Sequence, residues 1–64
     1  MKCYEIEVGC FVTIQVGNSY IIEADSEEEA KNTAKLALMN TINDNYSWAD
    51  YDEADFNFGY IREV

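Results

Sequence analysis

The sequence contains no histidine and only four basic residues. The lack of histidine removes the commonest general base, the Ser-His and Cys-His nucleophile pairs and most catalytic zinc sites. No glycine-rich phosphate-binding loop occurs, and the thiols and serine hydroxyls have no familiar base to activate them. We therefore expect that the protein is not an enzyme and that it uses no cofactor.

Long apolar runs are also missing. No segment approaches the roughly 18 apolar residues that a membrane span needs, and Met1 begins a polar segment instead of the apolar core of a secretory signal. Cys3 and Cys10 form neither a C-x-x-C motif nor a disulfide framework. We expect a cytoplasmic protein that does not contact membranes and whose two thiols are free.

Acidic residues dominate the charge, with thirteen against four basic ones and a net charge of -9 over 64 residues. This charge would repel the phosphate backbone of nucleic acid and an anionic membrane, so we expect no direct nucleic-acid binding. The hydrophobic fraction of 48% is far above that of disordered acidic tails. We expect one folded domain, residues 1–64, which is too small to enclose a large active site.

Apolar residues take every second position from Tyr4 to Val16, which is the period of a half-buried strand. The pattern predicts one long strand, with a bend or bulge at Gly9, where the backbone tolerates it best. The apolar side of this strand would face the core. Its members are Tyr4, Ile6, Val8, Cys10, Val12, Ile14 and Val16.

Gly17-Asn18-Ser19 is the strongest turn motif in the chain, because glycine and asparagine tolerate positive φ. It predicts a three-residue hairpin loop that places Val16 opposite Tyr20. The second strand would then run from about Ser19 to Ala24. Even-numbered residues of both strands would share one face of the sheet.

A helix is predicted from Glu27 to about Ile42, where no proline or glycine interrupts the chain. Ser26 can accept from the amide of Glu29, whose side chain can reach back to the Ser26 amide, and three glutamates suit the positive end of the helix dipole. The predicted buried stripe is Ala30, Ala34, Ala37, Leu38 and Thr41. Leu36 and Met39 point away from it, either as isolated exposed residues or as a contact surface.

Phe56, Phe58 and Tyr60 alternate with smaller residues and predict a third strand that continues to Val64. We expect these rings, with Tyr4 and Tyr20, to face the small alanines of the helix. The order β-β-α-β predicts an α+β fold: a three-stranded antiparallel sheet, its first strand central, with one helix packed on one face. The open face would carry Glu5, Glu7, Thr13, Gln15, Ile21 and Glu23.

Between helix and third strand, Asn43 to Asp55 contains five acids and three large aromatics, and loops of this length are often functional. The segment lacks the glycine and the final glutamate of a calcium-binding loop, so we expect no metal site. Its acids either serve solubility alone or imitate nucleic acid toward a basic groove, with the aromatics as anchors. The helix-start glutamates already oppose the helix dipole, whereas the loop acids have no comparable local role, so this loop is the preferred site. Trp48 is either a core residue or an interface residue. The candidate partner-binding residues are Tyr46, Trp48, Asp50, Tyr51, Asp52, Glu53 and Asp55.

The segment Ile21 to Ala30, with Asp50, Asp52 and the closing Phe56-Asn57-Phe58, resembles the DpnD/PcfM-like small proteins of phages, plasmids and other mobile elements. The resemblance covers Tyr20 to Val64. It implies a ββαβ-like fold and a mobile-element setting. The function of that family is not established, so the resemblance carries over no site residues.

By analogy with small acidic inhibitors found in that setting, the resemblance implies a small acidic interaction module that inhibits a host defence protein, of the anti-CRISPR or anti-restriction type. It would act as a nucleic-acid mimic that occludes a basic nucleic-acid-binding surface. The alternative is a structural or assembly component of a mobile element, whose charge gives only solubility. In either case a homodimer stays open, because burying a sheet edge or the open face would enlarge a small core.

Overall fold

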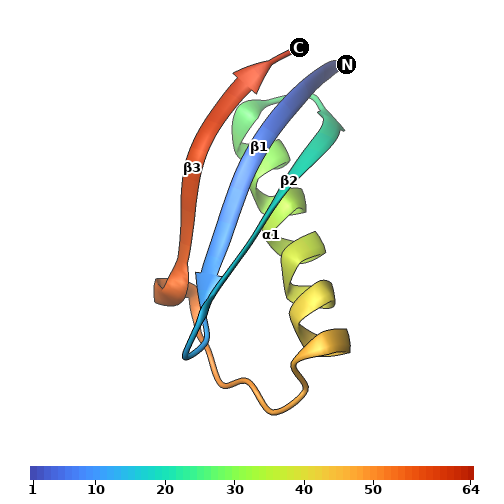
Figure 1. Ribbon diagram of the computed structural model, residues 1–64. Helices are drawn as coiled ribbons and strands as arrows, with labels where there is room; N and C mark the ends of the chain where they lie inside the picture. Colours follow the sequence, from blue (N-terminus) through green and yellow to red (C-terminus); the bar gives the residue numbers. More distant parts are fainter.

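The computed structural model describes residues 1–64 and contains one three-stranded antiparallel sheet with one α-helix on one face (Figure 1). The elements are β1 (Lys2–Phe11), β2 (Gln15–Ala24), α1 (Glu27–Asn45), the short 3-10 helix η1 (Glu53–Asp55) and β3 (Phe56–Glu63). The strand order β2-β1-β3 places the first strand in the centre. The predicted α+β class, element order and central first strand are confirmed.

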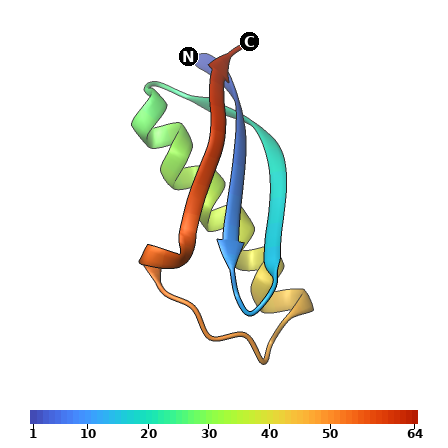
Figure 2. The ribbon, with the colours of Figure 1, turned by 60° about the vertical axis from the view of Figure 1, so that its left-hand side comes forward.

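Both ends of the chain lie at one end of the sheet, while the β1–β2 turn and the segment from α1 to β3 lie at the other (Figure 2). The backbone amide of Val64 donates to the carbonyl of Cys3 at 2.9 Å, which fixes the end of β3 beside the start of β1. The molecule therefore has a terminal end and a loop end.

The hairpin between β1 and β2 turns at Val12–Ile14, so the predicted turn at Gly17–Ser19 is wrong. Phe11 pairs with Gln15, and the two strands have ten residues each. This register gives every residue of β1 a partner in β2, whereas a turn at Gly17 would pair Ala24 with Val12 and leave all of β1 unpaired on that side. The gain in ladder hydrogen bonds outweighs the local preference of the Gly-Asn pair and the positive φ of 90° that Thr13 must adopt.

The predicted strand faces survive this change of register, because the observed pairs still join even-numbered residues to even-numbered ones. Tyr4 lies opposite Ile22, and Ile6 lies opposite Tyr20. Ile14 is the exception: as a turn residue it is exposed, although the alternation placed it in the core. The predicted single strand to Val16 with a bend at Gly9 is wrong, because β1 ends at Phe11 and the chain turns there into β2.

Helix α1 begins at the predicted cap, where the amide of Glu29 donates to Oγ of Ser26 at 3.2 Å. The predicted return bond from the Ser26 amide to Glu29 is not formed. The helix continues one turn beyond the prediction, and Tyr46 closes it by donating to the Ile42 carbonyl at 2.7 Å. Its buried residues are Ala30, Ala34, Leu38 and Ile42, while Ala37 and Thr41 are only half-buried.

Strand β3 contains a bulge that changes which of its side chains face the helix. Ile6 of β1 lies opposite Ile61 and Val8 opposite Phe58, so two residues of β3 face one residue of β1. Tyr60 is therefore turned outward and is 40% exposed, and Ile61 takes the inner position. The prediction that Tyr60 lines the core is wrong, because alternation cannot continue through a bulge.

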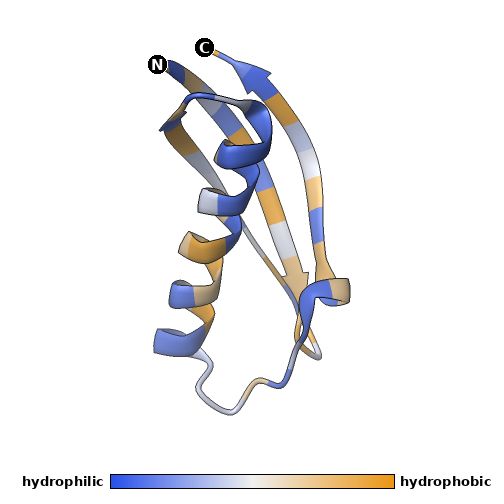
Figure 3. Cartoon of the chain, turned by 180° about the vertical axis from the view of Figure 1, so that it is seen from behind, coloured by the Kyte–Doolittle hydropathy of each residue, from blue (hydrophilic) through white to orange (hydrophobic).

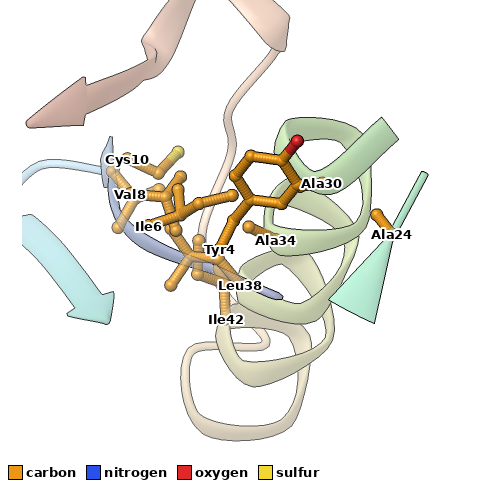
Figure 4. Close-up of a cluster of buried hydrophobic side chains, with 10 residues drawn as sticks. Tyr4, Ile6, Val8, Cys10, Ala24, Ala30, Ala34, Leu38 and Ile42 are labelled. Carbon is orange, nitrogen blue, oxygen red and sulfur yellow. The ribbon is translucent and has the colours of Figure 1, made fainter. Parts of the chain in front are cut away.

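The core lies between β1 and α1 and contains ten buried residues (Figure 4). Large side chains of β1, such as Tyr4 and Ile6, meet the small Ala30 and Ala34 of the helix, as expected. From the helix side, an apolar band midway along α1 is visible between two polar ends (Figure 3). Leu36, at the middle of the α1 segment, is 59% exposed. The structure contains no helix with the length and apolar composition needed to cross a membrane.

Candidate interaction surface

A tight turn after α1 presents Trp48 to solvent. The amide of Ala49 donates to the carbonyl of Tyr46 at 2.8 Å, and the side chains of both residues pack against the core. Trp48 lies between these two anchors and is 63% exposed. Its ring meets the Tyr46 ring edge-to-face, with 5.9 Å between the ring centres. Trp48 is therefore a surface residue on a turn held by a hydrogen bond, and it is not part of the core.

Tyr51 supports the loop from inside. Its hydroxyl donates to Oδ1 of Asn43 at the end of α1, at 3.1 Å, and its ring meets Phe56 of β3 edge-to-face at 5.7 Å. Tyr46 is likewise half-buried. Of the three aromatic candidates, only Trp48 offers most of its surface to a partner.

Three of the four candidate acids have partners within the chain. Asp52 caps η1 by accepting from the Ala54 amide at 2.9 Å, and Asp55 accepts from the Asp52 amide at 3.0 Å. Glu53 pairs with Lys35 of α1 at 3.1 Å. The premise that these carboxylates lack a local role is therefore wrong; sequence analysis missed it because the capping pair belongs to a helix of three residues.

Asp50 differs from its neighbours, since it is exposed and makes no hydrogen bond or ion pair. It lies two residues after Trp48 and is joined to it through Ala49, which is held by the turn. The structure thus brings together an exposed indole and an unpaired carboxylate. No three cysteine, aspartate or glutamate side chains are grouped so that they could hold a metal ion.

The hairpin turn adds two exposed apolar residues to the loop end, and sequence analysis missed both as surface candidates. Phe11 is 54% and Ile14 is 49% exposed, on either side of the strained Thr13. Their exposure depends on the turn position, which local sequence preference placed elsewhere. Figures 1 and 2 show this turn and the segment carrying Trp48 at the same end of the molecule.

Every basic side chain already has a partner within the chain. Lys2 pairs with Glu63 at 3.8 Å, Arg62 pairs with Glu5, and Lys35 pairs with Glu53. Lys31 lies 5.5 Å from the centre of the Phe58 ring. The segment from residue 40 to residue 55 contains no basic residue at all. The unpaired acids of the loop end therefore have no cation of the chain available to them.

Comparison with protein-family models, with curated proteins and with solved structures gave no match. The resemblance to the DpnD/PcfM-like proteins stays a prediction from the sequence.

Proposed function

We propose that the protein is an interaction module that binds a basic surface of another protein through its loop end. The observation that carries this proposal is Trp48, 63% exposed on a turn whose end residues, Tyr46 and Ala49, pack against the core. A rigid aromatic side chain loses little entropy when a partner covers it, and tryptophan is the residue type most enriched at binding hot spots. Asp50 beside it adds an unpaired negative charge.

A basic partner is the one that this charge distribution favours. With a net charge of -9 and its four basic residues engaged, the protein attracts cationic surfaces at long range and repels nucleic acid. A surface that normally binds nucleic acid has the required charge. The mobile-element setting implied by the resemblance suggests that such a partner is a host defence protein, which the module would occlude.

The test is capture of a partner from nuclease-treated host lysate by four matched single variants. Trp48→Ala removes the anchor, and its control is Leu36→Ala, which removes an apolar side chain of similar exposure on α1. Asp50→Lys reverses the unpaired charge, and its control Glu28→Lys makes the same change at the helix start. We expect Trp48→Ala and Asp50→Lys to lose capture while both controls keep it.

Binding should also weaken as salt is added, and the partner's own nucleic acid should compete with the module. Capture that is equally strong in all four variants, or that is indifferent to salt and nucleic acid, would contradict the proposal.

A second function is favoured by the open sheet face, which carries the exposed apolar side chains of Ile21 and Tyr60. An assembly component could bury these residues against a second copy. Sedimentation at low and high salt separates this case, because salt would screen the repulsion between the two acidic faces and strengthen a homodimer. A monomer at both salt concentrations excludes it.

A further inference from the structure

All three glycines of the chain meet on the open face of the sheet. Gly9 and Gly17 are direct partners across β1 and β2, and Gly59 lies in the bulge of β3 beside them. Without side chains at these positions, the middle of the face is hollowed by about 440 Å³. The polar residues around the hollow whose side chains belong to this face are Glu7, Gln15, Ser19 and Asn57.

Flexible polar side chains lie across two of these glycines. A methyl group at Gly59 would collide with the carboxylate of Glu7, and one at Gly9 would collide with the amide of Gln15 and come within 3.0 Å of Oδ1 of Asn57. The carboxylate and the two amides are therefore laid onto the floor of the hollow. Glu7, Gln15 and Asn57 nevertheless remain exposed.

Gly17 is different, because a methyl group there would meet only the Val8 carbonyl, at an ordinary 3.6 Å. Its φ is not positive, so neither packing nor backbone conformation requires glycine at this position. Glycine inside a strand costs stability relative to residues with a side chain. The fold therefore gives no reason for glycine at position 17, whereas keeping the hollow open does.

The hollow contains one charge and no counter-ion. Glu7 makes no ion pair, although Glu5, two residues earlier on the same face, is paired with Arg62. Because every basic side chain is engaged, any cation that neutralises Glu7 must come from outside the chain. The side-chain amides of Gln15 and Asn57, which line the same hollow, can supply neutral acceptors.

From this geometry we infer that the glycine-floored hollow binds the guanidinium group of an arginine side chain on a partner protein. A guanidinium is planar and can lie flat on the bare backbone at Gly17, the one glycine that no side chain covers. It presents several N–H donors in fixed directions to one carboxylate and neighbouring amide oxygens. A lysine ammonium is a point charge that would gain little from the flat floor. The inference rests on the proposed function in taking the partner to be basic.

The test uses the whole chain and capped tripeptides, Gly-Arg-Gly and Gly-Lys-Gly, followed by NMR of backbone and side-chain amides. Free arginine amide is the third probe, and it separates a protein arginine from a small guanidinium metabolite. We expect the arginine peptide to shift Gly9, Gly17 and the side-chain amides of Gln15 and Asn57. We also expect it to bind at least about tenfold more tightly than the lysine peptide.

Two variants remove the site by different means. Gly17→Val fills the hollow at a strand position that accepts a side chain, so it should keep or raise the melting temperature while abolishing peptide binding. Glu7→Gln removes the charge, and its control Glu23→Gln removes one from the same face outside the hollow. Equal affinity for both peptides, shifts that lie elsewhere, or unchanged binding by Gly17→Val would overturn the inference. Tighter binding of free arginine amide than of the peptide would reassign the site to a small molecule.

Failure of this inference can be told apart from failure of the proposed function, because the peptide experiment needs no natural partner. If Trp48→Ala abolishes capture and no peptide binds, the interaction module stands without the arginine site. If the arginine peptide binds the hollow while capture ignores Trp48 and Asp50, the hollow stands and the proposed function fails.

Discussion

The carboxylate of Asp55 accepts a hydrogen bond from the backbone amide of Asp52 at 3.0 Å, while Asp52 in turn caps the same short helix. These two acids hold η1 at the entry to β3 and are not free for a partner. Reversing the charge of the whole acidic loop at once would therefore damage the fold and the binding surface together. Single substitutions are needed to separate the two effects.

We predict that Asp52→Ala and Asp55→Ala each cost about 1 kcal/mol of unfolding free energy, the usual loss for a helix cap. Asp50→Ala should cost less than about 0.5 kcal/mol, as for other exposed positions without partners. Urea unfolding followed by far-UV circular dichroism measures all three. Equal losses at the three positions would mean that the capping pair contributes no stability of its own.

The two leucines of α1 should respond in opposite ways to the same substitution. Leu38 is fully buried and Leu36 is 59% exposed. Leu38→Asp places an unpaired charge between helix and sheet and should unfold the domain, whereas Leu36→Asp should change stability by less than about 0.5 kcal/mol. Thermal melts test this directly. Similar melting temperatures for both variants would contradict the observed helix face.

The turn at Thr13 should be improvable, because a β-branched residue at a φ of 90° is strained. Thr13→Gly relieves a backbone strain of about 1 to 2 kcal/mol. Part of this gain is offset because glycine gives the unfolded chain more conformational freedom, so we expect a small net gain in stability. Its control is Ser19→Gly, the same kind of change inside β2, which should destabilise by about 0.5 to 1 kcal/mol. A loss at Thr13 as large as that at Ser19 would argue against the observed turn.

Burial raises the pKa of the Cys10 thiol above its ordinary value of 9.0, and the carboxylates of Asp55 and Asp52 raise it further. The folded protein thus keeps this proton at pH values where the unfolded chain loses it. The contribution of Cys10 to the free energy of unfolding is therefore complete below about pH 9 and falls as the pH rises beyond it. Cys10→Ala should remove this part of the alkaline decline.

At pH 8, a thiol reagent should modify the half-buried Cys3 faster than the buried Cys10. Equal rates would contradict the burial.

Side-chain period was sufficient to predict which faces of β1, β2 and α1 are buried, because each face repeats over many residues. Register was not predictable, since Gly17-Asn18-Ser19 is the better turn locally and loses only to pairing along the full length of two strands. The outward position of Tyr60 follows from a single extra residue in β3, which no alternating pattern reveals. In the loop, composition selected Trp48 and Asp50 as candidates, and both are exposed, but it could not show that neighbouring acids of the same type hold η1.

The meeting of both chain ends beside Cys3 and Val64 has a practical consequence. A linker, fluorophore or affinity tag attached at either terminus would project from the terminal end of the molecule and leave Trp48 uncovered. An immobilised protein would then display its loop end in one orientation, whichever terminus is used. Fusion to a second protein at either terminus should preserve partner capture, whereas an insertion at the Val12–Ile14 turn should obstruct it.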